Sequence, residues 1–328
     1  MKVNFVISKD LKSKIFFDIF KRFFAYSDNS VQYIVSEKPV SDADIYHYHR
    51  PQLENKLSSP SVVTVHHDLL DPDPWLAQSH IINIYKKSSM VICLNEEQKN
   101  LLAQKDIHHT CVIPHGYDER ISKKDIKEFP AKNERRIRLG LFSKYYERRV
   151  KGEAYLEELA ELLPTDIFEF VLCGQGRSVQ AAHLGSLGFK VECYEHLPYP
   201  VFSKLYEEID FLLVCSLYEG GPACVPEAIA SGTPVIGTKV GFIPDLIHPG
   251  KNGFFISGDI RKDIKFFNAL ARNKDGIYKT LQEGARAINS ALCWEKIINK
   301  HIDIYRSLAN EGVGADKKVE TEDLIKII

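Results

Sequence analysis

Residues 211–237 read FLLVCSLYEGGPACVPEAIASGTPVIG and contain one complete strand–helix–strand unit. The apolar run 211–214 predicts a strand, and residues 225–231 predict a helix that ends at Gly232. Residues 234–237 predict the next strand. Two strands joined through a helix run parallel, so this stretch predicts a parallel sheet covered by helices.

The same alternation of short apolar runs and amphipathic stretches extends over most of the 328 residues. A polar stretch with a single proline, residues 120–136, interrupts it and is typical of a linker. Before the linker we expect strands at 3–7, 31–35, 61–65, 90–94 and 110–113, with helices at 11–25, 75–88 and 96–104. After it we expect further strands at 137–142, 168–173 and 190–194, with helices at 152–163, 200–208 and 262–272. The sequence therefore predicts two Rossmann-like α/β domains, at 1–130 and 131–300.

The bulk composition is that of an ordinary globular protein, with 44% apolar residues. A formal net charge of -1 argues against bulk attraction to nucleic acid, and no nucleic-acid partner is expected. The seven cysteines form no CxxC pair, so we expect reduced thiols and a cytoplasmic protein. Lysines interrupt any N-terminal signal segment, and no run reaches the roughly 20 apolar residues of a membrane span. The histidines show no metal-ligand spacing, and no metal site is predicted.

The distribution of glycine indicates where a nucleotide could bind. The chain has 19 glycines, and the first is Gly116. A loop that holds a phosphate needs glycine for positive φ and for close approach of the backbone, so the nucleotide site is predicted in the second domain. There Gly220 and Gly221 stand just before the helix expected at 225–231, whose N-terminal N–H groups and dipole favour a diphosphate.

Two glutamates flank the start of that helix. Carboxylates do not hold phosphate, so we expect Glu219 to accept hydrogen bonds from sugar hydroxyls and Glu227 from ribose hydroxyls. The alternative interpretation is that Glu227 only complements the helix dipole and Glu219 is a solvated loop residue.

The E-x7-E spacing of these residues, the Glu-Gly-Gly-Pro opening at 219–222 and the close EAIASGTPVI at 227–236 resemble glycosyltransferase family 4, retaining enzymes of the GT-B fold. Further matching segments follow in the order of that family, at 64–68, 112–118, 141–144, 151–152, 171–176, 240–245 and 252–253. The resemblance spans about residues 60–306. It implies an acceptor-side domain at 1–130 facing a donor-binding domain at 131–300 across a cleft. It also implies a C-terminal helix and tail, 301–328, that crosses back to the first domain.

The resemblance also implies residue roles. Glu219, His66 and Lys151 are the implied catalytic residues. The implied donor-binding residues are Ser143, Lys144, Lys151, Gly174, Gly220, Gly221, Pro222, Ala223, Cys224 and Glu227. Ser143-Lys144 stands where the family has Gly-Arg, and lysine keeps the charge but lacks the bidentate fork of arginine. Residues 7–11, ISKDL, stand where the family has a glycine-rich acceptor loop.

Histidines of the first domain are candidates for the acceptor side. His66, His67 and Asp68 directly follow the strand expected at 61–65 and therefore lie at its carboxyl end. By resemblance His66 contacts the transferred sugar, and His67 and Asp68 are acceptor-side candidates. His47 and His49 follow another strand end and are further candidates, with a purely structural role as the alternative.

The function implied is transfer of a sugar from a nucleoside diphosphate sugar to a glycan, lipid-linked or other acceptor, with retention of configuration. The expected setting is bacterial-type polysaccharide or glycoconjugate biosynthesis, with no cofactor besides the sugar donor as co-substrate. The basic, phenylalanine-rich residues 11–25 predict peripheral contact with the inner face of the membrane, or alternatively a helix packed on the first sheet. Other functions left open are a GT-B epimerase or phosphorylase and a non-catalytic nucleotide-sugar-binding protein. A dehydrogenase built on Gly174-Gln175-Gly176 is disfavoured because a third glycine is missing at the right spacing.

Overall fold

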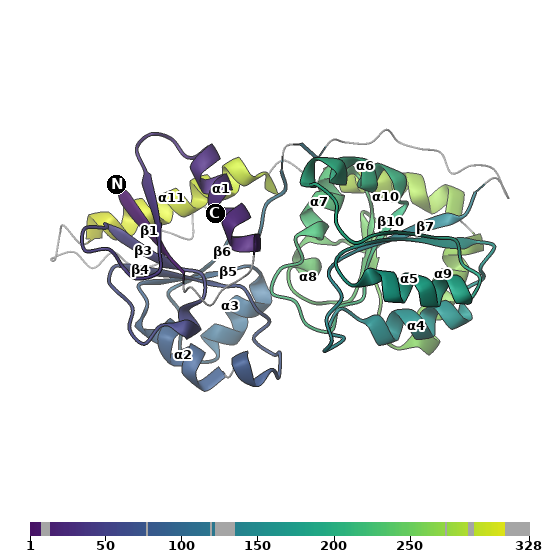
Figure 1. Ribbon diagram of the computed structural model, residues 1–328, viewed down its shortest axis with the longest axis horizontal. Helices are drawn as coiled ribbons and strands as arrows, with labels where there is room; N and C mark the ends of the chain where they lie inside the picture. The colour runs from purple at the N-terminus through teal and green to yellow at the C-terminus, as the bar shows by residue number, and fades with distance from the viewer. Residues whose placement is uncertain are drawn as a thin grey trace. The chain divides into compact units, whose positions relative to one another are not determined.

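The computed structural model describes residues 1–7, 14–76, 78–118, 120–121, 135–272, 274–287 and 292–311. The chain forms two compact units (Figure 1). Unit 1 comprises Met1–His115 together with the chain from Trp294 on, and unit 2 comprises Gly116–Cys293. Residues 11–13, most of the expected linker and the tail 312–328 lie outside the described residues.

Unit 1 is built on a parallel sheet with the strand order β2-β1-β3-β4-β5-β6. Its strands are β1 (Lys2–Val6), β2 (Gln32–Ser36), β3 (Ile45–Tyr48), β4 (Ser61–Val65), β5 (Met90–Cys93) and β6 (Thr110–Val112). Its helices are α1 (Lys14–Tyr26), α2 (Gln78–Lys87), α3 (Glu96–Ala103) and α11 (Trp294–Glu311), with the 3-10 turns η1 (Pro51–Leu53) and η2 (Pro74–Leu76). Helices α1 and α11 cover one face of the sheet, and α2 and α3 cover the other (Figure 1).

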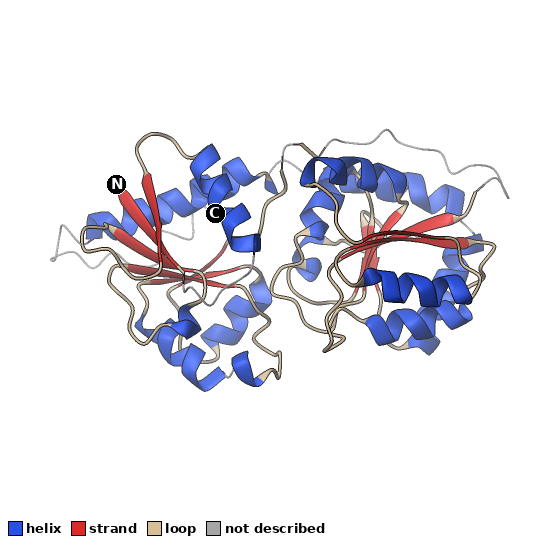
Figure 2. Cartoon of the chain, viewed as in Figure 1, coloured by secondary structure: helices blue, strands red, loops and turns tan. Residues whose placement is uncertain are grey.

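Unit 2 is built on a second parallel sheet, with the order β12-β11-β10-β7-β8-β9. Its strands are β7 (Ile137–Phe142), β8 (Phe168–Cys173), β9 (Val191–Tyr194), β10 (Phe211–Val214), β11 (Val235–Gly237) and β12 (Gly253–Phe255). Its helices are α4 (Glu153–Leu162), α5 (Arg177–Ser186), α6 (Phe202–Glu208), α7 (Cys224–Ser231), α8 (Ile243–Leu246), α9 (Ile260–Arg272) and α10 (Lys274–Ala287), with the 3-10 turn η3 (Tyr199–Val201). Helices lie on both faces of this sheet (Figure 2).

The helix α11 joins the core of unit 1 although it follows unit 2 in the chain. Trp294, Ile298 and Tyr305 are buried in the same apolar cluster as Phe5 and Phe20 of β1 and α1. The sequence analysis places the crossing-back helix and tail at 301–328, whereas α11 spans Trp294–Glu311.

Four elements of unit 2 are absent from the sequence-based expectation: α5, α8, α10 and β12. Helix α10 has the sequence KDGIYKTLQEGARA, and its glycines lower the helix propensity. A Cβ on Gly284 would lie 1.9 Å from the carbonyl oxygen of Lys251, so glycine here allows the helix to lie against that loop. Strand β12 is only three residues long, and it is a strand because its backbone pairs with β11. Tertiary packing decides both elements.

The described part of the chain contains no helix that combines the length and the apolar character needed to cross a membrane.

Gly152, the N-cap residue of α4, offers a test of the unit 2 packing. Its φ is +77°, and a Cβ there would lie 2.0 Å from the carbonyl oxygen of Cys215. We expect Gly152→Ala to lower the free energy of unfolding by about 3 kcal/mol, because backbone strain and a backbone clash add together. The matched control is Gly250→Ala, which has a φ of +78° but places its Cβ within 4 Å of no described atom. The control substitution is expected to lower the free energy of unfolding by about 1 kcal/mol. Urea unfolding followed by circular dichroism measures both, and equal losses would contradict the packing argument.

Candidate active site

A buried ion pair joins two loops at the carboxyl edge of the second sheet. Lys151 follows β7 just before α4, and Glu219 follows β10. The Lys151 Nζ lies 2.5 Å from Glu219 Oε1, and only 16% and 10% of the two side chains are exposed. Ser216 Oγ donates a second hydrogen bond, 2.8 Å long, to the same carboxylate oxygen. Burial opposes the charge on Lys151, but the charge and hydrogen bond of Glu219 outweigh it and raise the pKa of the lysine.

A second implied donor-binding lysine, Lys144, lies near Lys151. The Nζ atoms of Lys144 and Lys151 are each 5.6 Å from the ring centre of Tyr146. Lys144 is exposed, whereas Lys151 is mostly buried. The structure therefore brings Lys144 and Lys151 to one tyrosine that the sequence analysis did not identify, and Glu219 is bonded to Lys151. A cation–aromatic contact of this kind orients a flexible lysine side chain.

The loop that carries Ser143 and Lys144 is held by Arg177, which is fully buried at the start of α5. Its Nε donates to the Ser143 carbonyl (2.8 Å) and its NH2 group donates to Ser143 Oγ (2.7 Å). Arg177 NH2 also lies 3.5 Å from the carboxylate of Glu153, which is equally buried. The hydroxyl of Ser143 thus serves to position its own loop. Nothing in the spacing of the motifs predicts this contact.

The glycines of the 174–176 turn have steric roles. A Cβ on Gly174 would lie 2.3 Å from the Ser143 carbonyl oxygen, and Gly176 adopts a φ of +85° at the start of α5. The carboxylate of Glu195 accepts hydrogen bonds from the N–H groups of Gly176 and Ser178, at 2.5 and 2.7 Å. These hydrogen bonds lower the pKa of Glu195. An acidic side chain thus occupies this helix start.

At the start of α7 the N-cap residue is Ala223, whose side chain makes no capping hydrogen bond. The residues before it, Gly220 to Ala223, form the turn, with Cys224 as the first helical residue and Ala223 in a helical conformation. The loop after β11 packs against this turn, because Gly241 would place a Cβ 2.9 Å from Pro222 and 3.2 Å from the Glu219 Cβ. Burial raises the pKa of Cys224, so its thiol is neutral.

Glu227, in the first turn of α7, has two tyrosine partners. Tyr206 Oη donates to Oε2 (2.8 Å), and Tyr199 Oη donates to Oε1 (2.5 Å). Glu227 is 7% exposed. Its carboxylate is therefore fixed by protein donors on both oxygens, and neither tyrosine figures in the sequence-based prediction.

In unit 1, His66 belongs to a stack of imidazole rings. Its Nε2 lies 2.9 Å from His49 Nδ1, and its ring stacks on that of His115 with the centroids 5.5 Å apart. Burial lowers the pKa of His66 and of His49, and the nearby imidazoles lower them further. Both rings are neutral near pH 7, so His66 offers hydrogen bonding rather than positive charge.

His47 lies deeper, completely buried in β3. Its Nδ1 is 2.7 Å from the Tyr305 hydroxyl, and its Nε2 is 2.7 Å from Thr64 Oγ1. Both ring nitrogens therefore have protein partners, an arrangement that favours the structural alternative for this residue.

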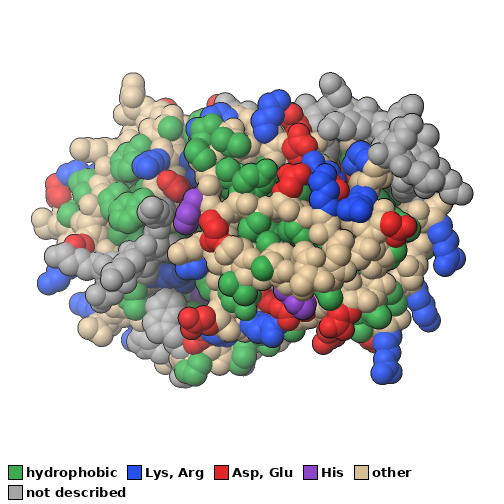
Figure 3. All heavy atoms as spheres, turned by 45° about the vertical axis from the view of Figure 1, so that its right-hand side comes forward, with side chains coloured by type: hydrophobic (Ala, Val, Ile, Leu, Met, Phe, Trp, Pro, Cys, Tyr) green, Lys and Arg blue, Asp and Glu red, His purple; other side chains and the backbone are tan. Residues whose placement is uncertain are grey.

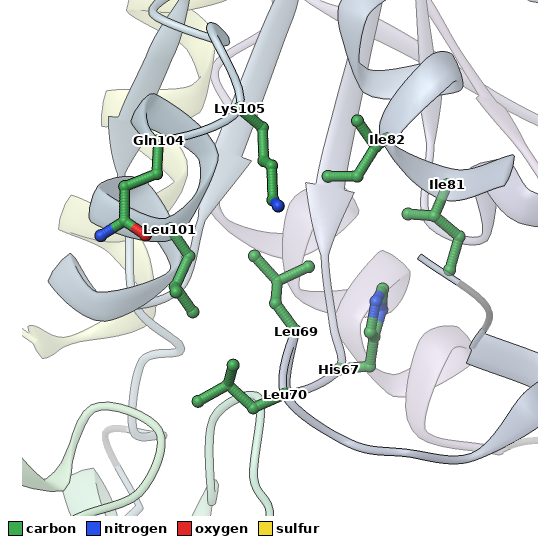
Figure 4. A pocket seen from close by; sticks show the side chains of 8 residues that line it. All are labelled: His67, Leu69, Leu70, Ile81, Ile82, Leu101, Gln104 and Lys105. Carbon is green, nitrogen blue, oxygen red and sulfur yellow. The ribbon is translucent and has the colours of Figure 1, made fainter. Parts of the chain in front are cut away.

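His67 lines a pocket that lies between the loop after β4 and the helices α2 and α3 (Figure 4). Its other lining residues are Leu69, Leu70, Ile81, Ile82, Leu101, Gln104 and Lys105. Burial lowers the pKa of His67 to about 4. Asp68 turns back on its own loop, where its Oδ1 accepts the N–H of Leu70 at 2.9 Å. The acceptor-side candidates are thus divided. His49 stacks with the implied catalytic residue His66 and with the buried His47, His67 lines the pocket, and Asp68 stays in its loop.

Two further properties concern charge. Lys and Arg side chains are intermixed with Asp and Glu on the face shown in Figure 3. Among the described residues, no group of three or more His, Cys, Asp and Glu side chains is arranged to hold a metal ion.

Comparisons with known proteins agree with the sequence resemblance. Residues 136–272 match the family Glycosyl transferases group 1. The chain is 24% identical over 286 residues to an uncharacterized glycosyltransferase of Methanocaldococcus jannaschii, covering 80% of this chain and 75% of that protein. It is 27% identical over 176 residues to the D-inositol 3-phosphate glycosyltransferase of Corynebacterium diphtheriae, covering 49% of this chain and 41% of that protein.

Two solved structures show the fold. Anabaena HepE, solved in complex with UDP and glucose, has a TM-score of 0.71 at 18% identity and matches 94% of this chain and 100% of its own. The sucrose-phosphate synthase of Thermosynechococcus elongatus has a TM-score of 0.74 at 14% identity, over 94% and 99% of the two chains. The predicted GT-B fold and glycosyltransferase resemblance are therefore confirmed.

The neutral histidines of unit 1 predict acid sensitivity. His67 and His301 are both buried, with pKa values of about 4 against an ordinary 6.5. The unfolded chain binds these protons more readily, so stability is complete above pH 6.5 and falls as the pH drops toward 4. At pH 5 each of these two histidines lowers the free energy of unfolding by about 2 kcal/mol relative to its value above pH 6.5. Both tryptophans, Trp75 and Trp294, lie in unit 1, so fluorescence-monitored urea unfolding reports this unit.

His301→Phe is the matched variant, because it keeps an aromatic ring against Phe23 and removes one titrating group. The loss of stability between pH 7.5 and pH 5 is expected to shrink by about 2 kcal/mol in this variant. A variant as acid-sensitive as the wild type would contradict the assignment.

Proposed function

We propose that this chain, a group 1 glycosyltransferase with the GT-B fold, transfers a sugar from a nucleoside diphosphate sugar to a glycan, lipid-linked or other acceptor, with retention of configuration. The observation that carries the proposal is the buried Lys151–Glu219 pair beside the start of α7. A cation, a carboxylate and a set of backbone N–H groups at one sheet edge are suited to a diphosphate with a sugar attached. HepE, which shares the fold, is a protein solved with UDP-glucose, so a uridine donor is the first to test.

The donor's diphosphate would lie at the start of α7, near Lys144 and Lys151. When the bond between the anomeric carbon and the diphosphate oxygen breaks, the electron pair stays on the diphosphate. The two lysines and the α7 dipole stabilise this developing negative charge. These groups supply the positive charge from the chain itself, and we propose no further cofactor.

The sugar of the donor would contact Glu219. In the structure this carboxylate accepts hydrogen bonds from Lys151 and Ser216. A carboxylate has about four acceptor positions, so it can also accept from sugar hydroxyls. Glu219 then links binding of the sugar to binding of the diphosphate, because it also holds Lys151, the lysine that contacts the diphosphate. Glu227 would accept the ribose hydroxyls in the same way.

Unit 1 would supply the acceptor side, with His66 orienting the transferred sugar. Neutral His66 fits this role, because a neutral imidazole can accept or donate a hydrogen bond beside a developing positive charge without repelling it. The pocket at His67 is a place where an apolar portion of an acceptor could lie. We place this chemistry in bacterial-type polysaccharide or glycoconjugate synthesis, at the cytoplasmic side of a membrane.

Peripheral membrane contact would use α1. Phe16, Phe20 and Phe23 face the sheet and are buried. On the outer side Phe17 and Phe24 are 50% and 51% exposed, and Lys21 stands between them at helical spacing. Aromatic rings flanking a lysine suit the boundary of an anionic bilayer.

Two substitutions separate the donor roles. Lys151→Ala should weaken binding of UDP and UDP-glucose alike, each by about 10-fold or more, because a charge-assisted contact to the diphosphate is lost. Glu219→Gln should weaken the binding of UDP-glucose by about 10-fold and leave the binding of UDP nearly unchanged, because only the sugar contact is lost. Isothermal titration calorimetry measures both ligands.

The control is Lys190→Ala, which removes an exposed lysine paired with Glu169 in the same unit. It should bind both ligands like the wild type. If Lys151→Ala and Glu219→Gln also did so, the proposed donor site would be wrong.

The membrane proposal has its own test. The double variant Phe17→Ser with Phe24→Ser should reduce co-sedimentation with phosphatidylglycerol-containing vesicles by about 10-fold, since two aromatic side chains no longer enter the bilayer. Leu162→Ser with Val179→Ser removes two exposed apolar side chains of unit 2 and serves as the control. Equal binding by both double variants would exclude α1 as the contact.

A further inference from the structure

Unit 1 contains a pocket that the donor chemistry of unit 2 does not use. It has a volume of about 150 Å³ and lies between the loop after β4 and the helices α2 and α3 (Figure 4). Most of its wall is aliphatic and is formed by Leu69, Leu70, Ile81, Ile82 and Leu101. Walls of leucine and isoleucine favour an apolar ligand over water, so the pocket is suited to an aliphatic chain.

The loop that forms one wall of the pocket is held in place by hydrogen bonds. Gln98 Nε2 donates to the carbonyl oxygens of Val65 and His67, at 3.3 and 2.9 Å. Farther along the loop, Asp68 Oδ1 accepts the N–H of Leu70 at 2.9 Å. The wall is therefore formed before a ligand binds, and the binding of a ligand does not have to order it.

His67 is a buried polar residue of this lining. Only 9% of the residue is exposed, and no hydrogen bond joins its imidazole to another group in the described part of the chain. Burial lowers the pKa of His67 to about 4, so the ring is neutral near pH 7. A neutral imidazole carries one N–H donor and one acceptor nitrogen. Since a buried polar group without a partner is costly, a ligand that bonds to this ring gains affinity.

Lys105 is the one charged side chain among the described residues that line the pocket. It follows the end of α3, and in Figure 4 its side chain extends toward Leu69. Its Nζ forms no ion pair with an acid of the described chain. The charges of Arg50 and Asp71 act on the pKa of His67 in opposite directions, and neither residue lines the pocket. An anionic group on a ligand would therefore meet a cation without a competing carboxylate in the lining.

We propose that this pocket binds an amphiphile with an aliphatic chain and an anionic group, the chain lying against the leucines and isoleucines and the anionic oxygens bonding to Lys105 and to the N–H of His67. A phosphate and a carboxylate share this chemistry. In the proposed function the amphiphile is the acceptor, and this assignment of its role rests on that function. It narrows the acceptor from a glycan, lipid-linked or other molecule to an anionic lipid.

The test measures binding to the full chain. NMR titration of the isotope-labelled protein gives the affinities for octyl phosphate, octanoate and octanol. The wild type should bind at least one of the two anions about 5-fold more tightly than octanol, the effect of an ion pair at a partly exposed site. The tighter anion identifies the head group as a phosphate or a carboxylate. The ring signals of His67 should shift, and those of His47, whose two ring nitrogens have protein partners, should not.

Two exposed residues of the pocket provide the variants. Lys105→Ala should remove the preference for the anions and leave the binding of octanol nearly unchanged, because only the charge is lost. Leu70→Ser should weaken the binding of all three ligands by about 5-fold, because part of the apolar wall is lost. The matched controls are Lys87→Ala, an exposed lysine of α2 outside the pocket, and Leu162→Ser, with 52% exposed against 51% for Leu70. Both controls should bind the ligands like the wild type.

The outcomes separate the inference from the proposed function. A chain that binds UDP and none of the three ligands overturns the inference and leaves the proposed donor site intact. Octanol binding as tight as that of the anions, or anion binding that Lys105→Ala does not weaken, also overturns the inference, because the charge then has no part in recognition. A chain that binds the anions in this pocket but no nucleoside diphosphate contradicts the proposed function, and the ligand class of the pocket stands.

Discussion

The ion pair between Lys151 and Glu219 joins residues that are 68 positions apart and holds two loops of unit 2 together. Both side chains are mostly buried, and removing two charges from water costs several kcal/mol per ion before their attraction is counted. Such a pair adds little net stability, although loss of one partner would leave an unpaired charge. Its value lies in placement, because a lysine tied to a carboxylate presents its remaining N–H donors in a fixed direction. A diphosphate carries more negative charge than Glu219 and can share this lysine without a large rearrangement.

The strand order explains why these loops meet. Strand β7 lies between β10 and β8, so the chain segments that follow these three strands share one edge of the sheet. Glu219 follows β10, Lys144 and Lys151 follow β7, and Gly174 follows β8. Arg177 then connects two of the segments through its bonds to Ser143. The site depends on parallel strands with this order, since another order would separate the lysines from the glutamate.

Much of this could be predicted from the sequence, and the exceptions have a physical pattern. Strand–helix alternation and the E-x7-E block predict two parallel sheets and place Glu219 and Glu227 around one helix start. The hydrogen bonds of Arg177 to Ser143 and of Tyr199 and Tyr206 to Glu227 were missed, because a hydrogen bond between distant positions leaves no periodicity or spacing in the chain. Helix α10 was missed for a related reason, because Gly284 weakens the local signal and is required by contact with Lys251. Local rules locate elements and motifs, whereas long-range contacts orient the side chains.

The two helix starts at this sheet edge show how similar sequence signals come to differ. Both α5 and α7 follow a strand and a glycine-containing turn, and each has a dipole that favours an anion. At α5 the Glu195 carboxylate already accepts two backbone N–H groups, so a diphosphate there would have to displace a charged side chain. At α7 the acid of the first turn, Glu227, is turned toward Tyr199 and Tyr206, and the side chain of the N-cap residue makes no capping hydrogen bond. The same tyrosines that fix Glu227 therefore keep its carboxylate off the N–H groups of α7. In the proposed donor site, the dipole of α7 then favours an anion while the two tyrosines hold Glu227.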